Sequence, residues 1–145
     1  MSAEVTATDF DKMILEGKKL SSIAQNVAIK VPLTFDGLRA CKAFSDDGIM
    51  VNVTLCFSAA QAILAAKAGA TYISPFIGRL DDIGSEGINL ISEIVEIYEL
   101  LIFKTKVLAA SIRSVQDVID SAKLGAHIAT IPPKIFKSKP PIAVT

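Results

Sequence analysis

Six short apolar runs alternate along the chain with segments of helical periodicity. The runs are rich in β-branched residues, which favours strands. In order, they are SAEVTA (2–7), VAIKVP (27–32), IMVNVTL (49–55), TYISPF (71–76), KVLAASI (106–112) and HIATI (127–131). Strands that alternate with helices in this way predict a parallel sheet, either open or closed into a barrel. No Gly-x-Gly-x-x-Gly sequence or P-loop follows a run, so the nucleotide-binding variants of this architecture lose their main support.

The segments between the runs carry the start and stop signals of helices. Three pairs with capping-box spacing follow a run directly, namely Thr8 with Asp11, Ser58 with Gln61, and Ser114 with Asp117. Glycines stand where a left-handed residue ends a helix, at Gly48, Gly69 and Gly125. Two of these segments each have an apolar face at helical spacing. In the first it is made by Phe10, Met13, Ile14, Gly17 and Leu20. In the second it is made by Ile91, Ile94, Val95, Tyr98 and Leu101, and Glu93, Glu96 and Glu99 face water. We therefore expect amphipathic helices that cover the sheet.

The overall composition indicates a buried sheet and a surface without a dominant charge. Hydrophobic residues make up 51% of the 145 residues, and the mean hydropathy is +0.48, as expected for strands covered on both faces. The 15 basic residues balance the 15 acidic ones, so we expect neither nucleic acid nor an anionic membrane surface as a partner. The length predicts a single domain over residues 1–145.

One uncharged stretch, residues 48–66, is long enough to span a bilayer. Its character changes halfway, from the strand-like IMVNVTLCF to the helix-forming SAAQAILAAKAG, so we predict a strand followed by a helix. The N-terminus lacks the charged-then-apolar layout of a signal peptide, and Cys41 and Cys56 form no Cys-x-x-Cys pair. We expect two buried, inert thiols and a cytoplasmic protein.

A lysine, Lys30, stands inside the apolar run NVAIKVP (26–32). Burying an ammonium group is costly unless the group is paired or loses its proton. The run alone leaves three explanations open: an amine that reaches solvent at the strand end, one half of an ion pair, or an amine kept neutral as a nucleophile. A neutral amine adds to a ketone, and the resulting Schiff base draws electrons from a neighbouring carbon–carbon bond.

Polar residues collect near the ends of the predicted strands. Side chains two apart in a strand face the same way, which pairs Asn52 with Thr54, Ser74 with Phe76, and Ser111 with Arg113. Each residue alone is explained as a strand-end polar group or a solvated arginine, but polar groups on six successive strands indicate a shared site. We therefore expect one cavity to collect Glu4, Lys30, Asn52, Thr54, Ser74, Arg79, Ser111 and Arg113.

Two parts of this expected cavity have a definite chemistry. Glu4 and Thr54 are placed to hold the water that shuttles protons while an imine forms. Ser111 and Arg113 directly precede the helix that Ser114 opens, so a hydroxyl, a guanidinium group and a helix N-terminus predict a phosphate site.

Three stretches resemble the small transaldolases of the transaldolase and fructose-6-phosphate aldolase family: NVAIKVPLTFDGL, VNVTLCFSAAQAILAAKAGATYISPFIGRLDDIG and VLAASIRS. The resemblance runs from residue 2 to about residue 136. It implies a TIM (β/α)8-type barrel and a transaldolase of the pentose phosphate pathway, which moves a dihydroxyacetone unit between sugar phosphates through a lysine Schiff base. The implied substrates are fructose 6-phosphate, sedoheptulose 7-phosphate, erythrose 4-phosphate and glyceraldehyde 3-phosphate, and no metal or cofactor is expected.

The resemblance also implies roles for single residues. Lys30 matches the Schiff-base lysine of the family, Glu4 the acid of the preceding strand, and Thr54 the threonine of its N-x-T sequence, so these three are the expected catalytic residues. The expected substrate-binding residues are Asn52, Ser74, Phe76, Arg79, Ser111 and Arg113, the last two at the sugar phosphate. Glu4 and Phe76 fit the transaldolase branch, because the aldolase branch has Gln and Tyr at these positions.

Two departures from the family pattern matter. A full barrel begins with two further strands that carry an Asp and an Asn, and the Asp is the acid–base residue for bond cleavage. In addition, IPPKIFKSKPPIAVT (131–145) is rich in proline and lacks the periodicity of a final helix. We expect about six β/α units, exposed sheet edges and a homo-oligomer. A shortened gene product, an excised fragment and a protein that closes its sheet by association all remain open, as do an aldolase-type lyase and a fragment that only binds.

Three other groups have simpler explanations. Asp9 is the nearest replacement for the absent acid, although charge at a helix N-terminus also explains it. Asp81 and Asp82 form either a paired-carboxylate site or, as we prefer, part of a solvated loop that precedes a helix. His127 has no clustered His or Cys with which to bind a metal.

Overall fold

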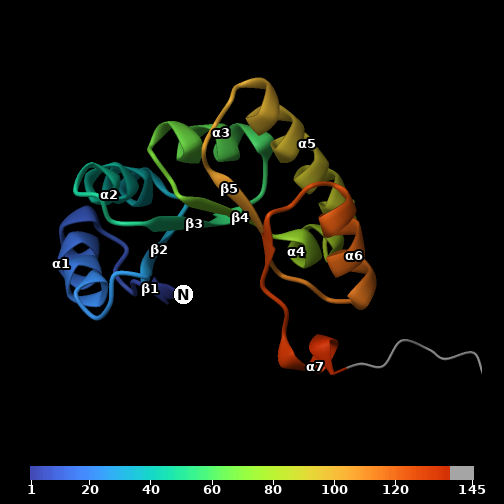
Figure 1. The fold of residues 1–145 in the computed structure, drawn as a ribbon, viewed down its shortest axis with the longest axis horizontal. Helices are drawn as coiled ribbons and strands as arrows, with labels where there is room; N and C mark the ends of the chain where they lie inside the picture. Colours follow the sequence, from blue (N-terminus) through green and yellow to red (C-terminus); the bar gives the residue numbers. More distant parts are fainter. Residues whose placement is uncertain (138–145) are drawn as a thin grey trace, which may run out of the picture.

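The computed structural model describes residues 1–137, which fold around one sheet of six parallel strands. The strands follow one another across the sheet in chain order: β1 (Ser2–Glu4), β2 (Ala28–Pro32), β3 (Val51–Cys56), β4 (Tyr72–Pro75), β5 (Lys106–Ala109) and β6 (Ile128–Ala129). The sheet curves, and all the helices except the short last one lie on its outer side (Figure 1). This half barrel is the incomplete TIM barrel that the sequence predicts.

Seven helices connect or follow these strands within residues 1–137. They are α1 (Phe10–Ser21), α2 (Phe35–Asp46), α3 (Ala59–Lys67), α4 (Ile77–Asp81), α5 (Gly87–Leu100), α6 (Val115–Lys123) and α7 (Pro133–Phe136). The uncharged stretch 48–66 forms β3 and most of α3, as predicted. In the part of the chain that the structure describes, no helix combines the length and the apolar composition needed to cross a bilayer.

The core lies between the convex face of the sheet and the helices. Ile29, Val51, Val53 and Val107 are fully buried on that side, because the helices cover the convex face of the sheet. Helices α1 and α2 approach closely at Gly17, where an added Cβ would stand 2.2 Å from Phe44 Cζ. The expected glutamates of α5 are exposed, and Ile91, Ile94, Val95 and Tyr98 of its predicted apolar face are buried. Leu101, the fifth residue of that face, is instead exposed at the C-cap.

The helix signals are confirmed in most places and wrong at one. Ser58 and Ser114 cap α3 and α6, with the full capping box at Ser114 and Asp117. The N-cap of α1 is Asp9 instead of the predicted Thr8, because Asp9 is extended and its carboxylate accepts the Lys12 backbone N–H at 3.1 Å. Gly48, Gly69 and Gly125 all have the positive φ that was predicted.

Four strands end earlier than the apolar runs do, β4 by one residue and β1, β5 and β6 by two or three. After β1, the Glu16 carboxylate accepts the backbone N–H groups of Thr6 at 2.7 Å and Ala7 at 3.2 Å, which diverts the chain from the sheet. After β5, Ser111 has a φ of 59°, which ends the extended backbone. The last run contributes only the two residues of β6. The proline-rich segment then forms the short helix α7, and residues 138–145 lie outside the described part.

Candidate active site

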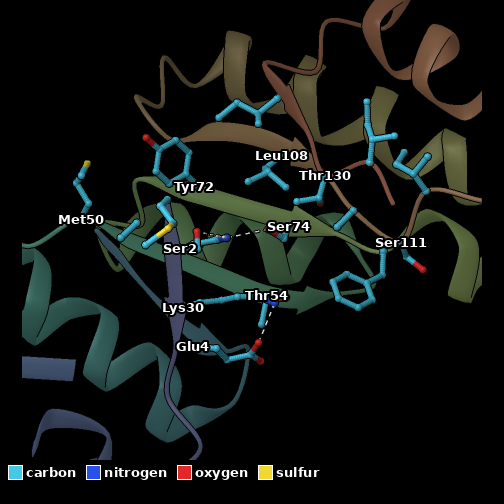
Figure 2. A pocket seen from close by; sticks show the side chains of 18 of the residues that line it. Ser2, Glu4, Lys30, Met50, Thr54, Tyr72, Ser74, Leu108, Ser111 and Thr130 are labelled. Atoms are coloured by element: carbon cyan, nitrogen blue, oxygen red, sulfur yellow. Dashed lines mark hydrogen bonds and ion pairs between the residues drawn. The ribbon is translucent and has the colours of Figure 1, made fainter. Parts of the chain in front are cut away.

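A cavity of about 730 Å³ opens on the concave face of the sheet. It is lined by seven of the nine predicted site residues: Glu4, Lys30, Asn52, Thr54, Ser74, Phe76 and Ser111. Figure 2 shows side chains from neighbouring strands pointing into this space. The register explains the gathering, because Glu4 pairs with Lys30 and Lys30 with Asn52 across β1, β2 and β3.

Lys30 and Glu4 form an ion pair at the edge of the cavity. Lys30 Nζ lies 3.0 Å from Glu4 Oε2, and the two side chains are 27% and 57% exposed (Figure 2). This pair is one of the alternatives that the run NVAIKVP leaves open. The amine is therefore held by a carboxylate, faces a space large enough for a small molecule, and sits beside a group able to take its proton.

A chain of hydrogen bonds fixes the amide of Asn52 deeper in the cavity. Ser74 Oγ donates to Asn52 Oδ1 at 2.7 Å, and Asn52 Nδ2 donates to Ser2 Oγ at 3.2 Å. Asn52 and Ser74 are almost fully buried, so the amide has little freedom to rotate. Ser2 was not among the predicted site residues, although its place two residues before Glu4 puts it on the same face of the strand.

Thr54 presents an unsatisfied hydroxyl to this space. Among residues 1–137, Thr54 Oγ1 and Ser121 Oγ are the buried side-chain oxygens that have no hydrogen-bond partner. Such groups are rare in folded proteins and often mark the place of a ligand or an ordered water. Thr54 lines the cavity with Lys30 and Glu4, so its free hydroxyl is available to whatever occupies the cavity.

The far end of the cavity contains Ser111 and Phe76. Ser111 is left-handed, which is costly for a residue other than glycine and is typical of functional sites. Phe76 follows β4 and precedes α4, and its ring contacts Phe57 edge-on with centroids 5.9 Å apart. The phenyl ring of Phe76 therefore forms an apolar part of the cavity wall.

Arg79 and Arg113 do not line the cavity, contrary to the expected convergence. Arg79 is exposed on α4, where its guanidinium carbon lies 5.4 Å from the centroid of the Phe76 ring. Arg113 is separated from Ser111 by the left-handed turn, so the alternation of strand side chains no longer applies. Its Nη2 lies instead 2.8 Å from Asp82 Oδ2.

Hydrogen bonds within the chain already use several backbone N–H groups at the start of α6. Asp117 accepts the backbone N–H groups of Arg113 at 2.8 Å and Ser114 at 3.0 Å, and Ser114 Oγ accepts the Asp117 backbone N–H at 3.1 Å. The backbone N–H groups of Arg113, Ser114 and Asp117 are thus already engaged at the helix start that the sequence assigns to a phosphate. For Arg113 to reach a phosphate in the cavity, its side chain would have to leave Asp82.

Glu4 is the only carboxylate among the described residues that line the cavity. Asp9 lies outside the lining, and the hydrogen bond from the Lys12 backbone N–H lowers the pKa of its carboxyl. Asp81 accepts the Gly87 backbone N–H at 2.8 Å and is the last residue of α4, whereas Asp82 lies in the exposed turn between α4 and α5, as expected of a solvated loop before a helix. Within residues 1–137, no three His, Cys, Asp or Glu side chains are grouped as metal ligands.

The two cysteines are free and buried, as predicted. Burial raises the pKa of the Cys41 thiol to about 12 and that of the Cys56 thiol to about 12. Neither thiol is in the cavity lining, so neither is placed to attack a ligand there.

Solved structures with a similar fold include two of mandelate oxidase. A mutant with the monooxide FMN adduct superposes with a TM-score of 0.65 at 18% identity, over 90% of this chain and 47% of that chain. A second structure gives a TM-score of 0.61 at 18% identity, over 90% of this chain and 47% of that chain. At this identity the likeness shows the fold alone.

Sequence relatives are much more similar. A "Probable transaldolase" of Ruegeria pomeroyi is 64% identical over 138 residues, which are 95% of this chain and 64% of the relative. A "Probable transaldolase" of Chelativorans sp. is 63% identical over 138 residues, again 95% of this chain and 64% of the relative. The chain therefore spans somewhat less than two thirds of the length of these relatives. The family described as transaldolase/fructose-6-phosphate aldolase matches residues 1–140, and the chain belongs to this family.

Proposed function

We propose that the chain carries the Schiff-base site of a transaldolase, with Lys30 as the amine that attacks a ketose phosphate. The observation that carries this proposal is the lysine held by Glu4 at 3.0 Å on the wall of a cavity lined by polar side chains. Family membership and the names of the relatives support a transaldolase-type reaction. The proposed reaction moves a dihydroxyacetone unit between sugar phosphates, as in the pentose phosphate pathway.

The first step is the formation of an imine. Glu4 takes a proton from the Lys30 ammonium, and the free amine adds to the ketone carbon of the donor sugar. The carbinolamine then loses its hydroxyl group as water, with a proton returned through Glu4 and a water held by Thr54. The unsatisfied Thr54 hydroxyl supports this role, because it lies in the same cavity and has no partner within the described residues.

Bond cleavage and transfer follow from the iminium ion. A base removes the proton from the hydroxyl on the fourth carbon, and the bond between the third and fourth carbons breaks. An aldose phosphate leaves, and a three-carbon enamine remains on Lys30. The enamine then attacks the aldehyde carbon of an acceptor sugar, and hydrolysis of the new imine releases the product. In this scheme Asn52 and Ser74 orient the hydroxyl groups of the bound unit, and their mutual hydrogen bond at 2.7 Å keeps both side chains in place.

The test is chemical trapping of the imine. Sodium borohydride reduction in the presence of fructose 6-phosphate, followed by peptide mass analysis, should mark Lys30. The Lys30→Met variant should lose the label, whereas Lys106→Met, at the exposed start of β5, should keep it. A label at another lysine, or none on folded protein, would contradict the proposal. Sugar-phosphate binding without trapping would instead identify a barrel that binds but does not react.

The phosphate is assigned to Ser111 and Arg113. Arg113→Ala should weaken fructose 6-phosphate binding by about 1.5–3 kcal/mol, the range for a hydrogen bond to a charged group. Trapping with unphosphorylated dihydroxyacetone should be less affected. Equal losses with both ligands would show that Arg113 supports the fold instead.

Glu4 and Phe76 are the reason for proposing transfer of the dihydroxyacetone unit to an acceptor sugar instead of its release by simple aldol cleavage. A hydroxyl at position 76 would help to protonate and release free dihydroxyacetone, whereas the phenyl ring of Phe76 offers no proton. Transfer to erythrose 4-phosphate should therefore exceed release of dihydroxyacetone, and Phe76→Tyr should shift the ratio towards release. Dominant release by the unchanged chain would favour the aldolase-type lyase.

A further inference from the structure

Arg113 is held outside the cavity by contacts with α4. The side chain lies against Gly78, where an added Cβ would stand 2.5 Å from Arg113 Nε and 2.6 Å from Arg113 Cγ. Asp82 follows Gly78 by one helical turn, so both are on the same side of α4 and Asp82 meets the guanidinium at 2.8 Å. The backbone is joined at the same place, because Gly78 N donates to Ser111 O at 3.0 Å.

Two neighbouring backbone donors are already engaged within the chain. Asp117 already accepts the backbone N–H groups of Arg113 and Ser114, while Ser111 lines the cavity. Arg79 and Arg113 are the two guanidinium groups near this end of the site, and Arg113 is the one that a carboxylate holds in the free chain. The pair is about half exposed on both sides, at 53% for Arg113 and 57% for Asp82, so a stronger anion from solution can displace the carboxylate.

We propose that Asp82 is a positioning residue that sets how strongly the site prefers phosphorylated sugars: its carboxylate holds Arg113 away from the cavity, and a ligand phosphate must take its place. This inference rests on the proposed function, in which Arg113 binds the phosphate of the sugar. The phosphate succeeds because it carries nearly two negative charges and more acceptor oxygens than a carboxylate. The competition lowers the affinity for phosphate, and it leaves Arg113 a partner to return to when each sugar phosphate departs.

The experiment compares dissociation constants for fructose 6-phosphate and inorganic phosphate at 0.15 M ionic strength, where long-range charge effects are largely screened. Asp82→Asn and Asp82→Ala should bind both ligands about two- to fivefold more tightly, because an exposed ion pair contributes about that factor. Asp81→Asn is the matched control. It removes the same charge from the adjacent residue, and its carboxylate accepts the Gly87 N–H instead of contacting Arg113. It should change the constants by less than about 1.5-fold.

The outcomes separate this inference from the function on which it rests. Tighter binding in both Asp82 variants, with weaker binding in Arg113→Ala, supports the inference, and damage to the fold does not produce tighter binding. Unchanged or weaker binding in the Asp82 variants, with a loss in Arg113→Ala, overturns the role of Asp82 and leaves the phosphate site intact. An unchanged dissociation constant in Arg113→Ala overturns both the role of Asp82 and the assignment of the phosphate to Arg113. Equal tightening in Asp81→Asn would show a general charge effect and would also overturn the role of Asp82.

Discussion

Thr54 and Ser121 have buried hydroxyl groups without a hydrogen-bond partner among the described residues, but only Thr54 faces the cavity. An unsatisfied buried hydroxyl costs stability, so a site that keeps one generally uses it. The pair offers a comparison within one molecule, because Ser121 is on α6 and outside the cavity lining.

We predict that Thr54→Val slows reductive trapping of the Lys30 imine by about 10²-fold, the lower range for lost acid–base assistance. Unfolding free energy should change by no more than about 1 kcal/mol, because no hydrogen bond within the described chain is lost. Trapping rates and urea unfolding curves measure the two effects. Ser121→Ala should leave the trapping rate unchanged, and an unchanged rate in Thr54→Val would remove Thr54 from the mechanism.

At the level of single residues, the sequence predicts side chains within strands much better than those beyond them. Lys30, Asn52 and Ser74 line the cavity because alternation holds as long as the backbone is extended. The expectation for Arg113 fails because Ser111 is left-handed, and no residue type in ASIRS marks this conformation. The partner of Arg113, Asp82, is 31 positions away in the chain, so no local pattern reveals the pair.

At the scale of elements, Glu16 of α1 determines where β1 ends. Its carboxylate accepts the backbone N–H groups of Thr6 and Ala7 and the hydroxyl of Thr6, so the chain leaves the sheet soon after Glu4. The Thr6 backbone N–H, followed by that of Ala7, lowers the pKa of the Glu16 carboxyl below its usual 4.5. This depressed pKa has a consequence for stability at low pH.

Between the lowered folded-state value and the usual 4.5, the unfolded chain binds the Glu16 proton and the folded chain does not. The stability from Glu16 is therefore fully present above about pH 4.5 and is lost as the pH falls through the folded-state pKa. We predict that Glu16→Gln lowers the Tm at pH 7 and flattens the fall in Tm between pH 5 and pH 3. Thermal melts across this range measure it, with Glu93→Gln on the exposed face of α5 as the control. Parallel Tm curves for Glu16→Gln and the unchanged chain would contradict the prediction.

The end of α5 contains a strained residue. Ile102 has a φ of 55° and is 86% exposed, so a β-branched side chain occupies the left-handed region without gaining burial. The left-handed conformation costs a non-glycine residue about 1–2 kcal/mol. Neither an active site nor a buried contact compensates for this cost in the described residues.

We predict that Ile102→Gly stabilises the fold by about 0.5–1 kcal/mol, since relief of strain exceeds the added freedom of the unfolded chain. Leu100→Gly is the matched control. It is also exposed, but it is helical, and its substitution should destabilise by about 1 kcal/mol. Urea unfolding of the unchanged chain, Ile102→Gly and Leu100→Gly measures the free energies of unfolding. A loss of stability in Ile102→Gly would show that the isoleucine side chain has a structural role.

The elements and most helix ends follow well from the sequence, whereas the strand ends do not. Ser58, Ser114 and the glycines mark helix boundaries because each satisfies a local backbone requirement. The early end of β1 depends on Glu16, a side chain from the next element, so the apolar pattern of SAEVTA overestimates the strand. The bulge in β3 between Val53 and Cys56 likewise has no marker, since a left-handed Leu55 is not expected from its residue type.

At the scale of the whole molecule, β1 and β6 each pair with one strand in the described sheet. Exposed edges of this kind favour pairing with another chain. We predict that the 145-residue chain associates with increasing concentration in light-scattering measurements. Ile128→Lys, which adds a charge to β6, should reduce association, whereas Ile119→Lys on α6 should not. A monodisperse monomer throughout the concentration series would contradict the prediction.

The cavity also limits the expected turnover. Imine formation uses Lys30, Glu4 and Thr54, all of which line it, but the cleavage step needs a second base, and Glu4 is the only carboxylate in the described lining. We therefore predict that steady-state transfer by the 145-residue chain is about 10²–10⁴ slower than imine formation on the same sample. Single-turnover trapping and a steady-state assay give the two rates. Equal rates would require another acid, and Asp9→Asn would be the first variant to examine.

The hydrogen bond from Asn52 to Ser2 connects β3 to β1 past the intervening strand β2. Strands two positions apart in a flat sheet are separated by about 10 Å, so a direct bond of 3.2 Å between their side chains requires the concave face to bring them together. The bond thus joins the two strands directly across the concave face of the half barrel. Ala28 pairs with Ser2 in the register and lines the same cavity, so β2 places only a methyl group beside Ser2. A larger side chain at position 28 would compete with this bond for space, so the curvature of the wall favours a small residue there.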